Sequence, residues 1–385
     1  MLTRIDMGEQ RLFLIFHGRF PSEKAAALFA AHTADAFVAI GARVTVLAPR
    51  RLGRSRTGAR EQYRLAQNFD VVYLPTLDLF SVPVLRLVAY YVSLFVFSIS
   101  AYAYLLFKAN RADTIYSNEM FPLLFATTFF RHTCYELHDY PEHNRFFYGL
   151  LFRRVARILV TNKWKLERLQ KDFPRAVPKA FLEPNAVSIT DFDIPITQSE
   201  ARTQLDLPQT EKIILYTGHL YSWKGVEVLA QAAQELPSEY TVYFVGGTPK
   251  DVEAFTKKWG SRKNIRIIGH RPHTEVPLWQ KAADVLVLPN TAKEAISQFY
   301  TSPMKLFEYM ASGTPVVASN LPSIVEILND ERGVLVEPDN SKALAQAIVH
   351  TLTDAQAHAR AQHAQAWVAD HTWEKRAARI LEKLG

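Results

Sequence analysis

The sequence predicts two doubly wound α/β domains in tandem, each built on a parallel sheet. At 385 residues, the chain is longer than one ordinary hydrophobic core requires. Short apolar runs alternate with helix-like segments twice along the chain, a pattern typical of parallel sheets covered on both faces. The polar stretch DFDIPITQSEARTQLDLPQTE interrupts this alternation. We therefore expect domains at residues 1–190 and 191–365, with a terminal helix at about 366–385 packing back on the first.

The first half of the chain contains the elements of one such domain. The run RLFLIFHG predicts a strand, PSEKAAALFAAHTADAFVAIG a helix that ends at glycine, and ARVTVLAP a second strand. Further strands are expected at DVVYLP, TIYSNE, TCYELH and RILVTN, followed by a helix over residues 163–171. The segment KAFLEPNAV closes this half.

The alternation restarts after the boundary. Strands are expected at KIILYTG, TVYFVGG, IRIIGH, DVLVLPN and TPVVAS, with helices at GVEVLAQAAQEL, DVEAFTKKWG, EVPLWQKA and around PMKLFEYMA. In doubly wound sheets, ligands bind beyond the carboxyl ends of the strands. We therefore expect the ligand of two facing domains to lie in the cleft between them.

Positive charge is concentrated in the first half. The net charge is +7, and residues 1–190 contain about 25 Lys or Arg against about 15 Asp or Glu. The excess is greatest in PRRLGRSRTGAREQYR. Two interpretations stay open: a solvated loop, or a surface for an anionic acceptor or membrane formed by Arg50, Arg51, Arg54 and Arg56.

The cysteine and histidine content bears on disulfide bonds, metal binding and the cellular compartment. The single cysteine, Cys134, excludes a disulfide framework and favours a reducing compartment. The histidines form no pair at zinc-helix spacing with a glutamate, so no metal site is predicted. The amino terminus is polar and lacks the apolar stretch of a signal peptide. These features predict a cytoplasmic protein.

One apolar run departs from the alternating pattern. LVAYYVSLFVFSISAYAYLLF, residues 87–107, has no charge and is long enough to span a bilayer. A crossing there would separate two strands of one sheet. The other interpretations are a helix buried in its own domain or a dimer, and a helix docked on a membrane surface. The tyrosine and serine hydroxyls favour the half-wet membrane interface.

The segment TSPMKLFEYMASGTPVVAS carries the strongest chemical signal. Ser302 is suited to cap a helix, Pro303 to occupy its first turn and Gly313 to end it. Lys305 lies in the first turn, where the helix dipole disfavours a cation unless an anion binds there. Glu308 lies about 9 Å along the helix, where one carboxylate can accept both hydroxyls of a ribose. An exposed Lys305–Glu308 ion pair is the alternative.

This segment resembles the nucleotide-binding signature of retaining glycosyltransferases with the GT-B fold, in particular glycosyltransferase family 4. ILYTGHLYSWKGVEVLAQA resembles the family's glycine, basic residue and Lys-Gly segment, and FLEPNAV resembles its Pro-Asn-Gly-Val turn. The resemblance covers nearly the whole chain and is strongest from about residue 180 to 340. It implies two Rossmann-like domains facing a cleft.

The resemblance also implies roles for individual residues. Glu308 matches the glutamate that holds the donor ribose, and Lys224 matches the lysine that holds the donor phosphates. Gly18 matches a loop that approaches the phosphates and sugar. His138 matches a histidine beside the transferred sugar, with Asp139 next to it, so the implied catalytic set is His138, Lys224 and Glu308. The other donor-binding residues implied are Gly218, His219, Ile268, Gly269, His270, Ser302, Pro303, Met304 and Lys305.

This chain departs from the family pattern at three places. The family usually spaces two glutamates by seven residues, but Tyr300 stands eight positions before Glu308. His219 occupies the position of a basic residue that the family carries fully charged. Ala186 follows Asn185, where the family commonly has glycine. Sugar contacts inferred from the first glutamate therefore do not carry over, and Ser302, Met304 and Lys305 are candidates to replace some of them.

The resemblance implies transfer of a sugar from a UDP- or GDP-linked donor to an acceptor glycan or lipid-linked sugar, with retention at the anomeric carbon. It implies no cofactor and no metal, because the leaving phosphate itself helps to deprotonate the acceptor. We expect peripheral attachment to the inner face of the cytoplasmic membrane, and no nucleic-acid partner. Two alternatives stay open: a non-catalytic GT-B-like subunit or sugar-nucleotide sensor, and an epimerase or phosphorylase of similar fold.

Overall fold

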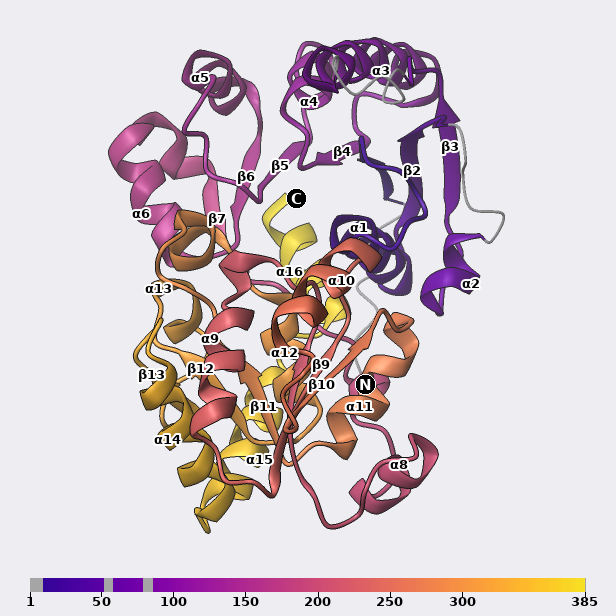
Figure 1. Ribbon diagram of the computed structural model, residues 1–385. Helices are drawn as coiled ribbons and strands as arrows, with labels where there is room; N and C mark the ends of the chain where they lie inside the picture. Colours follow the sequence, from indigo (N-terminus) through magenta and orange to yellow (C-terminus); the bar gives the residue numbers. More distant parts are fainter. Residues whose placement is uncertain (1–9, 52–57, 79–85, 385) are drawn as a thin grey trace. The chain divides into compact units, whose positions relative to one another are not determined.

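The computed structural model describes residues 10–51, 58–78 and 86–384, and the chain divides into two compact units (Figure 1). The first unit joins Met1–Glu183 to Trp373–Gly385, and the second is Pro184–Thr372. The division falls at Glu183, earlier in the chain than residue 190. The reason is that Val187 forms a bridge with Thr372, which ties the segment after Glu183 to the second unit.

Within its described residues, the first unit has a parallel sheet of seven strands in the order β3-β2-β1-β4-β5-β6-β7. The order changes direction between β1 and β4, and this is where ligands bind in doubly wound sheets. The elements are β1 (Arg11–Ile15), α1 (Ala25–Ala39), β2 (Arg43–Pro49), α2 (Ala59–Tyr63), β3 (Asp70–Leu74), α3 (Arg86–Lys108), β4 (Thr114–Ser117), α4 (Met120–Ala126), β5 (Thr133–Leu137), α5 (Arg145–Arg154), β6 (Arg157–Val160), α6 (Lys163–Asp172), η2 (Pro174–Lys179), β7 (Ala180–Leu182) and α16 (Trp373–Leu384).

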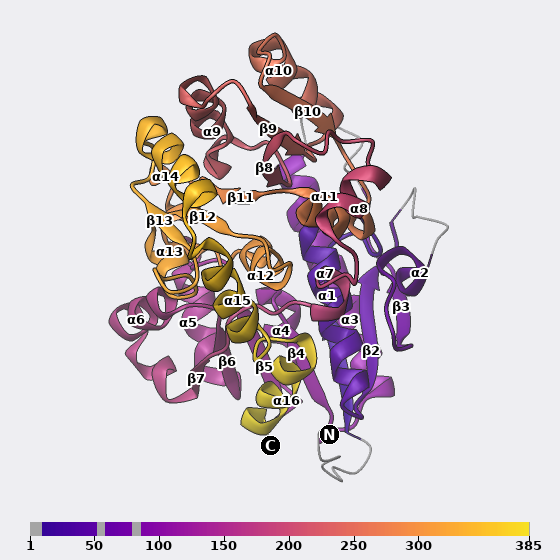
Figure 2. The same ribbon diagram turned by 90° about the horizontal axis from the view of Figure 1, so that it is seen from below.

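Helices cover both faces of this first sheet. Figure 1 shows α3, α4 and α5 on one face of the strands, and Figure 2, seen from below, shows α1 and α16 on the other. The α16 helix packs on α1, with the rings of Trp373 and Phe29 5.2 Å apart. Arg376 of α16 is 1% exposed and donates a hydrogen bond of 2.5 Å to Glu136 at the end of β5. The last helix therefore completes the first unit.

The second unit, which is described throughout, has a parallel sheet of six strands in the order β10-β9-β8-β11-β12-β13. Its elements are α7 (Ile189–Phe192), α8 (Gln198–Gln204), β8 (Lys212–Thr217), η3 (Ser222–Lys224), α9 (Val226–Ala232), η4 (Ala233–Glu235), β9 (Tyr240–Val245), α10 (Pro249–Trp259), β10 (Ile265–Gly269), η5 (His273–Glu275), α11 (Val276–Ala282), β11 (Val285–Leu288), the π-helix η6 (Ile296–Tyr300), α12 (Met304–Ala311), β12 (Val316–Ser319), α13 (Pro322–Val325), β13 (Val334–Val336), α14 (Ser341–Thr353) and α15 (Ala357–Val368).

The central strand of this second sheet is buried on both faces. Ile213 and Leu215 of β8 belong to one hydrophobic core, and Ile214 and Tyr216 belong to the other. Because successive side chains of a strand point to opposite faces, a continuous apolar run is what such a strand requires. This sheet also changes strand direction, between β8 and β11, so the loops after those strands are positioned to bind a ligand.

The long apolar run forms α3, whose 23 residues lie against the first sheet. Within the described part of the chain, it is the one helix long and apolar enough to cross a membrane. Its inner face is buried, including Leu94, Phe97, Ala101 and Leu105, and it joins two strands of the same sheet. A membrane-spanning orientation is therefore incompatible with the folded unit.

Candidate functional site

The helix that carries Lys305 and Glu308 begins differently from the prediction. Pro303 is its N-cap residue, with an extended backbone, so the prediction that Ser302 caps the helix is wrong. Ser302 is instead held by Asn185, whose side-chain amide donates a hydrogen bond of 2.5 Å to its carbonyl oxygen. The Pro-Asn turn thus fixes the loop before α12. Gly313 follows the helix with a φ of 70°, as its predicted role at the helix end requires.

Lys305 points back toward the end of β8. Its Nζ lies 3.9 Å from the centre of the Tyr216 ring, on which a cation is stabilised by the π electrons. Gly218 approaches so closely that a β-carbon there would lie 2.8 Å from Lys305 Nζ, and its φ of 120° also favours glycine. The Nζ atom is buried and has no hydrogen-bond partner among the residues that the structure describes.

Lys224 supplies a second cation from the loop between β8 and α9. Its Nζ lies 3.7 Å from the centre of the Trp223 ring. Gly225 has a φ of 70°, and a β-carbon there would overlap the Pro289 carbonyl oxygen at 1.7 Å, so only glycine permits this turn. The close packing of the loop holds Lys224 near the carboxyl edge of the second sheet.

The two lysines share an electrostatic environment that lacks an anion. Burial lowers the pKa of Lys224 to about 8. Burial, with the charge of Lys224, holds the pKa of Lys305 well below its ordinary value, although Glu308 opposes this effect. Among the described residues, no carboxylate lies within ion-pair distance of either ammonium group. A bound anion would therefore stabilise both charged forms.

His219 lies beside this lysine pair. Its ring stacks on Tyr221, with ring centres 4.9 Å apart and planes 8° from parallel. Burial lowers the pKa of His219, and the charges of Lys305 and Lys224 lower it further. The ring is therefore mainly neutral near pH 7 and offers one N–H group rather than a full positive charge. Its Nδ1 atom is buried and has no hydrogen-bond partner in the described part of the chain.

Glu308 lies one turn beyond Lys305 on α12. Its Oε1 is 3.1 Å from Nε2 of His273, in the loop after β10. Burial opposes the charged imidazole, but the hydrogen bond and charge of Glu308 outweigh it and raise the pKa of His273. The carboxylate is therefore oriented toward the segment after β10, a strand that ends with Ile268 and Gly269 and is followed by His270.

The loops after β8, β9 and β10 contact one another through their backbones. The Gly246 amide donates to the Gly269 carbonyl at 2.7 Å, and the Gly218 amide donates to the Val245 carbonyl at 2.8 Å. A β-carbon on Gly246 would lie 2.5 Å from the Gly218 oxygen. This packing brings the predicted donor-binding residues of the second unit, from Gly218 to Glu308, to one edge of one sheet.

The predicted residues of the first unit lie at the carboxyl edge of its own sheet. Gly18 follows β1, and a β-carbon there would collide with the Phe16 ring at 2.3 Å. His138 follows β5, where its Nε2 is 3.2 Å from Oε1 of Glu136. Although burial disfavours its charge, Arg376 lowers the pKa of Glu136 to about 2, so this carboxylate is ionised beside His138. Asp139 is exposed.

The arginine-rich run is not one continuous surface. Arg50 is exposed, whereas the Arg51 side chain is only 9% exposed. Arg51 donates to the His17 carbonyl at 3.0 Å and lies 3.8 Å from Asp78, so it stabilises the first unit from within. Arg54 and Arg56 lie outside the described residues.

Two residues at the site were not predicted from the sequence. His273 was not selected, although it follows directly on the predicted base-binding loop as GHRPHTE. Tyr216 reads as an ordinary strand residue, and no local signal indicates that its ring faces Lys305. Within the described residues, no group of three His, Cys, Asp or Glu side chains is placed to hold a metal ion.

Comparisons with known proteins agree with this geometry. Residues 211–354 match the family described as Glycosyl transferases group 1. This match lies within the second unit, Pro184–Thr372. A D-inositol 3-phosphate glycosyltransferase from Corynebacterium urealyticum is 31% identical over 196 residues, 47% of this chain and 45% of that protein. The chain spans about half the length of the curated relatives that it matches.

Solved structures resemble this chain in fold over nearly its whole length. The sucrose-phosphate synthase from Thermosynechococcus elongatus matches with a TM-score of 0.79 at 20% identity, covering 97% of this chain and 98% of that one. The Anabaena protein HepE, solved in complex with UDP-glucose, matches with a TM-score of 0.70 at 18% identity, covering 97% and 100%. The two Rossmann-like units therefore have the fold of GT-B glycosyltransferases.

Proposed function

We propose that this chain transfers a sugar from a nucleoside diphosphate sugar to an acceptor, with retention at the anomeric carbon. The observation that carries the proposal is the pair of lysines, Lys224 and Lys305, whose ammonium groups lie on aromatic rings without a carboxylate partner. A diphosphate is the ligand that would satisfy two such cations together. Charge that develops on a leaving diphosphate would be stabilised by groups already in position.

The other residues at the carboxyl edge of the second sheet would bind the remaining parts of the donor. Glu308 would accept the ribose hydroxyls in place of its contact with His273. Ile268, Gly269 and His270 would meet the base, and Ser302, Pro303 and Met304 precede or begin the helix beside the phosphates. Gly218 would let the backbone approach the phosphates closely, because no side chain separates it from Lys305.

We extend the proposal to the first unit on the basis of the family resemblance. His138 would donate a hydrogen bond to the transferred sugar, and Gly18 would let the backbone approach it. The leaving phosphate would take the proton of the attacking hydroxyl, so the protein need only hold the charge and the geometry. This scheme requires no metal and no cofactor.

We propose a chemical class for the donor and one for the acceptor. UDP is favoured as the first nucleotide to test, because HepE was solved with UDP-glucose, and GDP is the alternative. We propose a lipid-linked or cell-surface glycan precursor as the acceptor, met at the inner face of the cytoplasmic membrane. The proposed donor binding by the second unit does not depend on which acceptor is used.

A donor screen tests the function directly. UDP, GDP, UDP-sugars and GDP-sugars are added singly, and the shift in unfolding temperature is measured. Nucleoside diphosphate release is then followed with the binding donor, with and without an acceptor extract. Release that requires the extract supports a transferase, whereas binding without release supports the alternative of a sugar-nucleotide sensor. Absence of nucleotide binding would overturn both.

Donor affinity is expected to fall as the pH rises above about 8. Below that pH, free Lys224 is already charged, so a diphosphate binds without proton uptake by Lys224. Above it, binding must return a proton to Lys224, and each pH unit lowers affinity by up to about ten-fold. Calorimetry with UDP in buffers of different ionisation heat measures both the affinity and the proton uptake. Lys224→Met should flatten the pH dependence, and an equally steep slope in that variant would contradict the assignment.

A further inference from the structure

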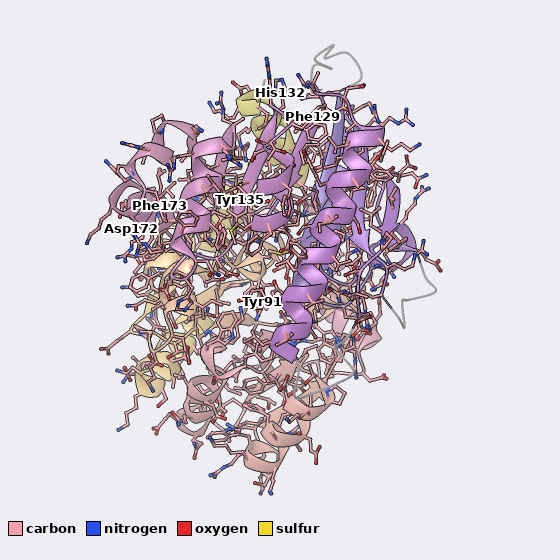
Figure 3. All side chains as sticks on the ribbon, turned by 90° about the horizontal axis from the view of Figure 1, so that it is seen from above. Tyr91, Phe129, His132, Tyr135, Asp172 and Phe173 are labelled. Atoms are coloured by element: carbon pink, nitrogen blue, oxygen red, sulfur yellow. The ribbon has the colours of Figure 1, made fainter. Side chains whose placement is uncertain are left out.

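The outer face of α3 presents an apolar stripe that none of the described residues of the first unit covers. Seven apolar or aromatic side chains on this face are 42–86% exposed. We call them the outer stripe: Leu87, Val88, Tyr91, Phe95, Ile99, Leu106 and Phe107. Most recur at a spacing of three or four residues, so they share one side of a helix about 34 Å long. Figure 3 looks onto this face and shows Tyr91 near one end of α3.

Two further aromatic residues enlarge this apolar face. Phe146 and Phe147, in the first turn of α5, are 73% and 40% exposed. The ring of Phe147 contacts Phe121 of α4, with ring centres 5.5 Å apart. The α4 helix in turn packs on α3, and Figures 1 and 3 show the three helices on the same face of the sheet. Large apolar patches of this kind mark interaction sites.

The charge of these three helices has a single sign. Their charged residues, Arg86, Lys108, Arg145, Arg153 and Arg154, are all basic, and their sequences contain no Asp or Glu. Arg145 lies 3.3 Å from Asp172 of α6, whereas Lys108, Arg153 and Arg154 are exposed at the carboxyl ends of α3 and α5. A partner for this face must therefore combine an apolar interior with a negative surface.

We infer that the outer stripe and the exposed aromatic residues of α5 dock on an anionic phospholipid bilayer. The apolar side chains enter the boundary between headgroups and acyl chains, and the basic residues meet the lipid phosphates. Tyr91 suits this boundary because it combines an apolar ring with a polar hydroxyl. The face would hold the proposed transferase at the membrane through residues of the first unit alone.

Flotation of the full chain with vesicles tests this inference. Vesicles of phosphatidylcholine with phosphatidylglycerol should carry the protein, and vesicles of phosphatidylcholine alone should carry much less. Binding should weaken from about 0.1 M to about 1 M salt, as the Debye length falls from about 10 Å to about 3 Å. Phe95→Ser with Ile99→Ser should reduce the bound fraction at least ten-fold. Arg153→Gln with Arg154→Gln should reduce affinity by about five-fold for each charge removed.

Matched substitutions in the second unit serve as controls. Val325→Ser removes an exposed apolar side chain, and Lys250→Gln with Lys257→Gln removes two exposed positive charges. These variants should float like the unchanged protein. Nucleotide affinity should stay the same in all variants, so a failure of the donor site is detected separately from a failure of docking.

Three results would overturn the inference. The first is a protein that ignores anionic vesicles, and the second is vesicle binding that survives both the Phe95/Ile99 and the Arg153/Arg154 substitutions. The third is a dimer in sedimentation velocity that Phe95→Ser dissociates, because the stripe would then be covered by a second copy of the chain.

Discussion

Replacing Lys224 with methionine is expected to lower kcat by about a hundred- to a thousand-fold, the usual effect of removing a group that stabilises charge in the transition state. The Lys224 ammonium has no competing carboxylate in the described structure, so its charge is available to a leaving diphosphate. Methionine keeps the apolar contact with Trp223 but not the charge. Turnover is measured as nucleoside diphosphate release in the presence of acceptor.

Two comparisons make this prediction specific. Lys257→Met changes an exposed lysine on α10 and should leave turnover unchanged. Lys305→Met should reduce turnover less than Lys224→Met, because Lys224 lies on a loop and is better placed to follow charge on the leaving group. Neither Lys224→Met nor Lys305→Met should lower the unfolding temperature of the ligand-free protein. Each change removes a positive charge that burial disfavours and that no carboxylate balances. Equal losses of kcat for the two lysines would contradict this order.

Replacing Glu308 with alanine is expected to weaken nucleotide binding by about ten-fold to more than a hundred-fold. Loss of one partner from a charged hydrogen bond at a buried site typically costs about 1.5–3 kcal/mol. The Glu308 side chain is only 13% exposed, and His273 holds its carboxylate. The dissociation constants of UDP for the unchanged protein and the variant are compared by calorimetry.

The choice of ligand shows whether Glu308 contacts the ribose. Inorganic pyrophosphate lacks a ribose, so Glu308→Ala should leave its affinity nearly unchanged, whereas Lys305→Met should weaken it. A 2′-deoxy nucleotide should lose less affinity than UDP in the Glu308 variant. His273→Ala should have a smaller effect than Glu308→Ala, because His273 orients the carboxylate rather than replacing it. Equal losses for UDP and pyrophosphate would exclude the ribose role.

The parallel sheets were predictable because their signals are local. Each strand is a short apolar run, and β8 is apolar at successive positions because two cores cover its two faces. The unit boundary was less predictable, since it depends on the pairing of Val187 with Thr372, which are far apart in the sequence. The polar stretch near which the boundary was placed also contains α8, which a capping box of Thr197 and Glu200 stabilises.

The motifs predict which residues form the candidate donor site, but they do not predict the contacts that these residues make. The motifs placed Lys224 after one predicted strand and Lys305 and Glu308 on one predicted helix, and in the structure the Lys305 side chain reaches the Tyr216 ring at the end of β8. Their environments are long-range properties: the ring of Tyr216 beneath Lys305, and the contact of His273 with Glu308. Arg51 was grouped with a surface run because local charge density does not show that a side chain turns inward.

The return of α16 to the first unit affects the order in which the chain can fold. During synthesis, domains usually fold from the amino terminus, but this unit lacks Trp373–Leu384 until the second unit has been made. Until then Arg376 has not been synthesised and Glu136 lacks its ion-pair partner. Leaving one member of a buried ion pair alone destabilises a protein by about 3–5 kcal/mol. The second unit should therefore resist protease first in nascent chains of increasing length. Protection of residues 10–183 before α16 emerges from the ribosome would contradict this order.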